Sequence, residues 1–125
     1  MSNTLGIKND VPNYKDDIAT FACLKDDGTL GEMYCSKSDL EKDSWFKELV
    51  DETANCAEYA AKYVARGEED ILQPIRLKIA KIMFKDQLSI LKRYAKKHDL
   101  PLSEDETEMN LLLKERDEEQ NAEVK

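Results

Sequence analysis

The pattern of apolar and polar positions changes along the chain, and the first clear change lies at Ile18. Between Ile18 and Cys35, two runs rich in apolar residues flank the segment Asp26-Asp27-Gly28-Thr29. An Asp-Gly pair predicts a tight hairpin turn, because glycine adopts positive φ without a steric penalty and aspartate tolerates it. We therefore predict two short antiparallel strands joined by a turn centred on Asp27 and Gly28.

A helical period follows the hairpin. From about Asp39 to Arg66, apolar residues recur at spacings of three and four, which is typical of an amphipathic helix. Ser38 and Glu41 form a capping-box pattern at its start, and Gly67 suits the position after its end. The predicted core face consists of Phe46, Leu49, Val50, Thr53, Ala57, Ala60 and Val64. The aromatic side chains expected at the shoulders of this face are Trp45, Tyr59 and Tyr63.

A second long helix is predicted from about Asp70 to Lys97, with Asp70 as its cap and Pro74 in its first turn, where a missing N–H costs least. Its main apolar set is Leu72, Ile75, Ile79, Ile82, Met83, Ile90, Leu91 and Tyr94. The further apolar positions are Leu77, Ala80, Phe84, Leu88 and Ala95. Together they cover about two-thirds of the helix circumference. Such a helix is expected to lie centrally, with neighbours on more than one side.

A third, shorter helix is predicted after Leu100-Pro101-Leu102, because Ser103 and Glu106 again form a capping-box pattern. Its apolar residues are few: Met109, Leu111, Leu112 and Leu113. The helix is therefore expected to dock over only about two turns. The chain beyond it is nearly all polar, and we expect residues 118–125 to fray.

These elements predict a mainly α (α+β) fold, in which a short N-terminal hairpin packs on two long antiparallel helices and a shorter C-terminal helix lies across them. Residues 1–15 have few large apolar side chains and are expected to form a flexible arm. Residues 16–117 then form one globular helical domain, followed by a polar tail over residues 118–125. A length of 125 residues is that of one ordinary domain.

The overall charge excludes one broad function class. Asp and Glu number 27 against 19 Lys and Arg, which gives a formal net charge of −8 at pH 7. A uniformly basic nucleic-acid-binding protein is thereby excluded. No apolar run reaches the roughly 18 to 20 residues that a membrane-spanning helix needs, and the first ten residues lack the pattern of a secretory signal. We expect a cytoplasmic protein with no membrane partner.

The positive charge is concentrated in the second long helix, where residues 75–98 carry a net charge of +7 within the total of −8. Five lysines recur there at helical spacings and form a lysine strip: Lys78, Lys81, Lys85, Lys92 and Lys96. Two interpretations are open. Acidic neighbours within the molecule cover the strip, or the strip binds a phosphate backbone or an acidic protein partner. No aromatic residue is interleaved with these lysines to stack on bases, which makes nucleic acid the weaker partner.

The first long helix carries acids on the side away from its core face: Glu48, Asp51, Glu52 and Glu58. One interpretation is a solvated surface. Another is that the carboxylates imitate the spacing of phosphates and occupy a partner's nucleic-acid channel. Glu48, Asp51 and Glu52 also resemble the magnesium-binding cluster of all-helical nucleotide hydrolases, which needs a second such cluster on a facing helix. The second long helix offers only Asp86 for that role.

The three cysteines, Cys23, Cys35 and Cys56, are expected to be reduced thiols, since their number is odd and no Cys-x-x-Cys pair occurs. In the predicted hairpin register, Cys23 faces Glu32 and Cys35 faces Thr20. The single histidine, His98, is explained by its place at a helix C-terminus. No phosphate-binding loop, nucleophile elbow or metalloprotease motif is present. We therefore predict no enzymatic activity, no cofactor and no metal.

The sequence thus favours a non-enzymatic protein-binding or regulatory module that acts through its acidic helix face, its hairpin edge or its tail. Its size and acidity suit a viral accessory protein, encoded by a phage or mobile element, such as an inhibitor or an assembly factor. An unpaired edge of the hairpin also predicts association with a second copy or with another protein. The alternatives are a nucleic-acid-associated protein that uses the lysine strip and a small helical Mg-dependent nucleotide hydrolase.

Overall fold

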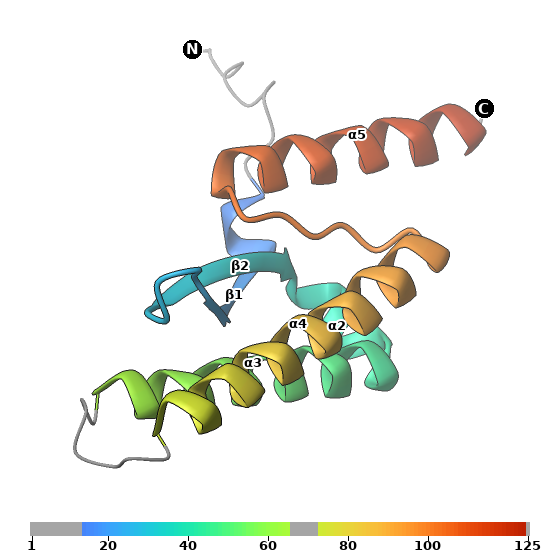
Figure 1. The fold of residues 1–125 in the computed structure, drawn as a ribbon. Helices are drawn as coiled ribbons and strands as arrows, with labels where there is room; N and C mark the ends of the chain where they lie inside the picture. The colour runs from blue at the N-terminus through green and yellow to red at the C-terminus, as the bar shows by residue number, and fades with distance from the viewer. Residues whose placement is uncertain (1–13, 66–72, 125) are drawn as a thin grey trace.

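The hairpin lies between two helical layers (Figure 1). The structure is a computed structural model and describes residues 14–65 and 73–124. Its elements in chain order are η2 (Lys15–Asp17), β1 (Ile18–Leu24), β2 (Leu30–Ser36), α2 (Lys37–Lys42), α3 (Ser44–Ala65), α4 (Gln73–Lys97) and α5 (Glu106–Val124). The antiparallel helices α3 and α4 form one layer, and α5 forms the other. The predicted mainly α fold with an N-terminal hairpin is confirmed.

The two faces of the hairpin serve two separate clusters of buried side chains. The larger cluster joins the hairpin to α3 and α4 through Phe21, Cys23, Met33 and Cys35. The smaller cluster joins the other face to α5 and contains Ile18, Met109 and Leu113. Because successive side chains of a strand point to opposite faces, one short hairpin can hold both layers. Leu30, at the start of β2, is 45% exposed and belongs to neither cluster.

The hairpin register differs by one residue from the predicted one. The observed pairs are Cys23 with Gly31 and Cys35 with Ala19, rather than Cys23 with Glu32 and Cys35 with Thr20. The cause is a three-residue turn: the Lys25 N–H donates to the Thr29 carbonyl at 2.8 Å, and Gly28 has a φ of 88°. A turn with one more residue than the predicted two-residue turn shifts every pair by one position.

The predicted first helix is two helices, because Asp43 interrupts it. Asp43 has extended backbone angles, and its carboxylate accepts hydrogen bonds from the N–H groups of Trp45 and Phe46, each at 3.1 Å. It therefore caps α3. The cap of the preceding α2 is Ser36, whose hydroxyl accepts from the Asp39 N–H at 3.3 Å, so the predicted Ser38 cap is wrong.

The core face predicted for α3 is confirmed over its described side chains. The buried members are Phe46, Val50, Thr53, Ala57 and Ala60, and Leu49 is half-buried. The aromatic shoulders are different from our expectation, since Trp45 is 68% exposed and Tyr59 is 54% exposed. These two rings add little to the core.

The face of α4 that packs combines Leu91 from the main predicted set with Ala80, Phe84 and Ala95 from the further positions. Its buried residues are Ala80, Phe84, Leu91 and Ala95. The main apolar set that we predicted is largely exposed, with Ile75 at 59%, Ile79 at 52%, Ile82 at 58% and Met83 at 53%. In the described part of the chain, α4 therefore has α3 and the hairpin on one side only. We predicted a central helix with neighbours on more than one side; α4 packs on both α3 and the hairpin, but its opposite side is exposed in the described residues.

Helix α5 begins and ends differently from the prediction. Asp105 lies directly before it and accepts a hydrogen bond from the Thr107 N–H at 3.1 Å, so Asp105 takes the capping role expected of Ser103. The helix then continues to Val124, where we expected fraying from residue 118. Its flank is held by Arg116, which donates to both carboxylate oxygens of Asp39 at 3.0 and 3.1 Å. The contact of Arg116 with Asp39 thus holds α5 against α2 beyond the apolar contacts of Met109 and Leu113.

Several predictions fall on residues outside those that the structure describes. They are the arm up to residue 13, the helix end at Gly67, the cap at Asp70, and the side chains of Tyr63, Val64 and Leu72.

Candidate functional site

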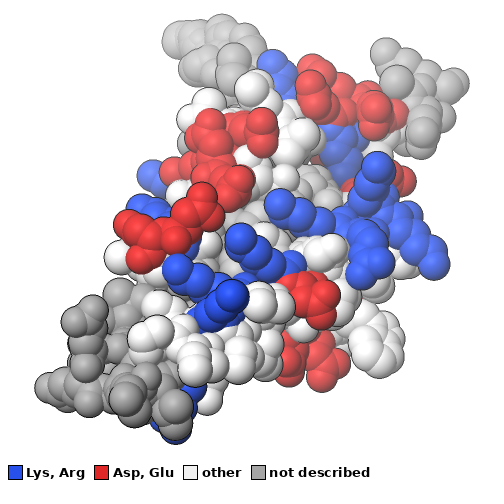
Figure 2. Space-filling model, viewed as in Figure 1, with Lys and Arg blue, Asp and Glu red and all other residues white. Residues whose placement is uncertain are grey.

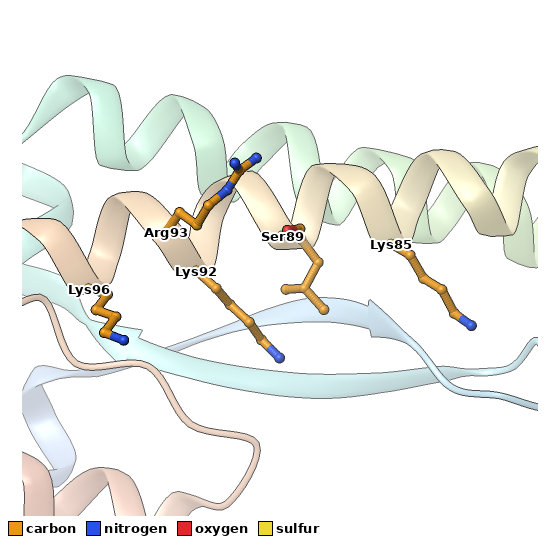
Figure 3. Close-up of a pocket in the computed structure, with 6 residues that line it drawn as sticks. Lys85, Ser89, Lys92, Arg93 and Lys96 are labelled. Carbon is orange, nitrogen blue, oxygen red and sulfur yellow. The ribbon is translucent and has the colours of Figure 1, made fainter.

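The middle and end of α4 form one wall of an open groove of about 400 Å³, which we call the basic groove. Its lining residues are Lys85, Leu88, Ser89, Lys92, Arg93 and Lys96. The side chains of Lys85, Lys92 and Lys96 project from the same side of α4, toward the hairpin, whereas Arg93 points the other way (Figure 3). Steps of seven and four residues return to nearly the same side of a helix, which explains the alignment of the three lysines.

The hairpin turn closes one end of the lysine strip. Lys81 is half-buried, and its ammonium donates to the Asp26 carbonyl at 3.4 Å. A smaller hollow beside this contact is lined by Leu24, Lys25, Asp26, Lys81, Phe84 and Lys85. Lys81 is therefore held against the turn, whereas Lys78 is exposed beyond it. Only the part of the strip from Lys85 onward opens into the basic groove.

Acidic residues stand at the other end of the groove. A neighbouring hollow of about 350 Å³ is lined by Met33, Lys92, Ala95, Lys96, Leu100, Leu102, Ser103, Glu104 and Glu108. Glu108 already accepts a hydrogen bond from the Ser103 hydroxyl at 2.6 Å. Within residues 14–65 and 73–124, neither Lys92 nor Lys96 forms an ion pair with these carboxylates. The acids therefore face the end of the strip without neutralising it by direct contact.

Within the described residues, acidic side chains do not cover the part of the lysine strip that lines the basic groove. Lysine and arginine side chains gather over α4 on the face shown in Figure 2, with acids at their borders. Lys47 pairs with Asp51 and Arg116 pairs with Asp39, and both ion pairs lie away from the lysine strip. Lys85, Lys92 and Lys96 are exposed. The strip is thus open over the basic groove.

The predicted acidic residues of α3 are not brought together with the lysines. Glu48, Asp51, Glu52 and Glu58 are all exposed, and Asp51 accepts from Lys47 at 2.9 Å one helical turn away. They spread over a wide arc of α3 rather than one row. Among the described residues, no three His, Cys, Asp or Glu side chains are grouped closely enough to hold a metal ion.

A buried polar cluster that the sequence did not reveal joins the hairpin to α2 and α5. Asp17 accepts hydrogen bonds from the hydroxyls of Ser36 and Ser38 at 2.7 and 3.1 Å and from the Ser38 N–H at 2.9 Å. Burial favours the neutral acid, but these hydrogen bonds and the charge of Arg116 outweigh it and lower the pKa of Asp17. Its residues are far apart in the chain, so no local spacing signals the cluster.

The thiols and the histidine give no catalytic arrangement in the described residues. All three cysteines are free, and burial, reinforced by the charges of Asp39 and Asp17, raises the pKa of Cys35 to about 12. A thiol of that kind is protonated and unreactive at neutral pH. The His98 ring lies against Tyr94, with 4.3 Å between the ring centroids, at the end of α4.

One edge of the hairpin is partly covered, and the other has no neighbouring strand among the described residues. The backbone of Tyr34 in β2 exchanges two hydrogen bonds with Ser103, at 2.8 and 3.2 Å, which covers one point of that edge. The sheet formed by the described residues has two strands, so β1 has no strand beside its outer edge. Association through the hairpin stays a prediction.

Comparisons with models of known families, with curated proteins and with solved structures found no match to this chain. None of the helices in the described segments combines the length and apolar character that crossing a bilayer requires. The exposed surfaces of the described residues are therefore the basis for a functional proposal.

Proposed function

We propose that this protein is a non-enzymatic binding module that holds an acidic segment of another protein in the basic groove. The observation that carries the proposal is the row of three exposed lysines, Lys85, Lys92 and Lys96, none of which has an ion pair among the described residues. Three aligned ammonium groups raise the local concentration of an acidic partner and fix its register.

The lining of the groove favours a protein partner over a nucleic acid. Leu88 lies between the lysines, and Met33, Leu100 and Leu102 continue an apolar floor beneath Lys92 and Lys96. An amphipathic acidic segment can place apolar side chains on this floor and carboxylates on the lysines. A phosphate backbone gains nothing from the floor, and its approach is opposed by the net charge of −8.

The test uses fluorescently labelled amphipathic acidic peptides, with duplex DNA and single-stranded RNA as comparison ligands. The variant Lys85→Glu/Lys92→Glu is expected to weaken peptide binding at least about tenfold, because each reversal turns an attraction into a repulsion. The control variant Lys37→Glu/Lys62→Glu makes the same change in net charge at exposed sites outside the groove and should bind normally.

Binding of the acidic peptides should also weaken as salt is added, since the contacts are exposed ion pairs. Tighter binding of DNA or RNA than of any acidic peptide would favour the nucleic-acid-associated alternative. Equal losses in the two variants would show that only net charge matters and would contradict a groove-specific partner.

The proposal includes a role as a small accessory protein, such as an inhibitor or assembly factor, working in the cytoplasm. Three free thiols, two of them buried, support a reducing compartment.

A further inference from the structure

Among the described residues, helices α3 and α4 have a second, exposed surface on the side of their layer that faces away from the hairpin. On α4 it consists of Ile75, Ile79, Ile82, Met83 and Ile90, in a row that Asp86 interrupts. These positions lie about a quarter to half a turn around the helix from the buried Ala80, Phe84 and Leu91. By the same helical geometry, Trp45 and Tyr59 extend the surface onto α3. We call this surface the outer face.

The outer face is large enough for a stable protein interface. At 1.5 Å per residue, the two helices are each about 30 Å long, and side by side they are about 20 Å wide. The flat projected area of this side is therefore about 600 Å². A standard interface buries roughly 800 Å² of accessible surface per partner, and the accessible surface of protruding side chains is larger than their projected area. A helix face that exposes this many large apolar side chains marks an interaction site.

The charges at one end of the outer face are arranged in opposite pairs. The Tyr94 hydroxyl donates to the Asp43 carboxylate at 2.8 Å, so the start of α3 lies beside the end of α4. The outer side of α3 carries Glu48 and Glu52 at this end, and the outer side of α4 carries Arg93 and Lys97. Acidic and basic halves thus lie next to each other across the helix pair.

We propose that the outer face binds a second copy of this chain around a twofold axis parallel to α3 and α4. Such an axis places α3 of each copy on α4 of the other, with the two ends described above at the same level. Glu48 then meets Arg93 of the second copy, and the Trp45 ring lies near the same cation. The four helices form an antiparallel bundle with the apolar rows inside, and one self-complementary contact closes the dimer.

The other simple twofold axis fits the charges less well. An axis across the helices would place α3 on α3 and α4 on α4. Arg93 and Lys97 would then face the first turns of α4 in the other copy, where the described charged residues, Arg76 and Lys78, are themselves basic. Like charges within an interface oppose association. The charge pattern therefore selects the arrangement of α3 on α4. The three lysines of the basic groove project from another side of α4, and Arg93 lies at the border between the groove and the outer face, so the dimer leaves these lysines open in both copies.

The first test measures the mass of the full chain by sedimentation equilibrium over a concentration series. The wild type should be a dimer, and Ile79→Glu should raise the dimer dissociation constant at least about tenfold, because it buries a charge in the apolar row. The matched control is Leu111→Glu, at an α5 residue that is 53% exposed and lies outside the outer face. Circular dichroism confirms that each variant is folded. A monomeric wild type at about 100 μM, where specific dimers with micromolar dissociation constants are formed, or equal effects of both substitutions, would overturn the proposal.

The second test decides the arrangement. Glu48→Arg and Arg93→Glu should each weaken the dimer several-fold, and the double variant should restore the affinity because the pair is then reversed rather than broken. Lys37→Glu, a charge reversal at an exposed residue of α2, should leave the affinity unchanged. A double variant no tighter than either single variant would overturn the pairing of α3 with α4.

Discussion

At the scale of single residues, Asp17 links the end of η2 to the start of α2. It accepts three hydrogen bonds from Ser36 and Ser38, and Arg116 adds a favourable charge. Because the pKa of Asp17 is lower in the folded than in the unfolded protein, its contribution to stability is complete above the unfolded value of about 3.9. That contribution is lost as the pH falls through the lower folded value.

We expect Asp17→Asn to reduce the free energy of unfolding by about 1 kcal/mol at pH 7, with a difference from wild type that shrinks below about pH 4. Urea unfolding at a series of pH values measures this difference. The neighbouring exposed residue provides the control, since Asp16→Asn should change little at any pH. A difference from wild type that stays constant between pH 7 and pH 2 would contradict the role given to the Asp17 charge.

At the scale of elements, α4 has one buried apolar face and one exposed apolar face. Leu91→Ala empties a fully buried position and should lower the free energy of unfolding by about 3 kcal/mol. Ile79→Ala removes a half-exposed side chain and should cost less than about 1 kcal/mol. Chemical denaturation compares the two variants, at protein concentrations below those at which the chain associates. The reverse order of effects would mean that the other face of α4 is packed.

The elements were predictable from the sequence where their signals are local. The Asp27-Gly28 pair and the helical periods gave the hairpin and the long helices. The turn length was missed because a Gly28 in the left-handed region fits both a two-residue and a three-residue turn. The choice between the two faces of α4 depends on contacts with α3, which a period cannot supply. The small side chains of Ala80 and Ala95, which allow close approach of helices, were the available signal.

The candidate site was predictable in part for the same reason. The spacing of Lys85, Lys92 and Lys96 follows from one helix, and the structure shows these three residues together. The apolar floor beneath them comes from Met33 on β2 and from the segment after α4, more than fifty residues apart in the sequence. No pattern within one element predicts that meeting.

At the scale of the whole molecule, α5 is the long helix with the fewest buried apolar side chains among the described residues. It docks through Met109 and Leu113, and its polar anchors are Tyr14, which bonds Asp117 at 2.7 Å, and the pair of Arg116 with Asp39. The carboxylate of Asp39 is largely buried. Removing Arg116 therefore leaves the Asp39 carboxylate charged, poorly solvated and unpaired with that arginine, which lowers the free energy of unfolding.

We expect Arg116→Ala to lower the free energy of unfolding by about 2 kcal/mol, since the arginine itself is partly exposed. Amide hydrogen exchange should quicken in α5 more than in α3, because α5 detaches locally. The control Lys62→Ala removes an exposed cation from α3 and should alter neither measurement. Uniform acceleration across all helices would contradict the local opening of α5.

The position of α5 also sets an order of events during synthesis of the chain. The hairpin and the α3–α4 layer can form early, but the opposite face of the hairpin waits for α5, which follows them in the chain. The hydrogen bond between Tyr14 and Asn110 spans 96 residues. Contacts between such distant residues form late, and an uncovered strand surface on a nascent chain attracts chaperones and other unfinished chains. The side of the hairpin that carries Ile18 thus stays uncovered in a nascent chain longer than the side that packs on α3 and α4.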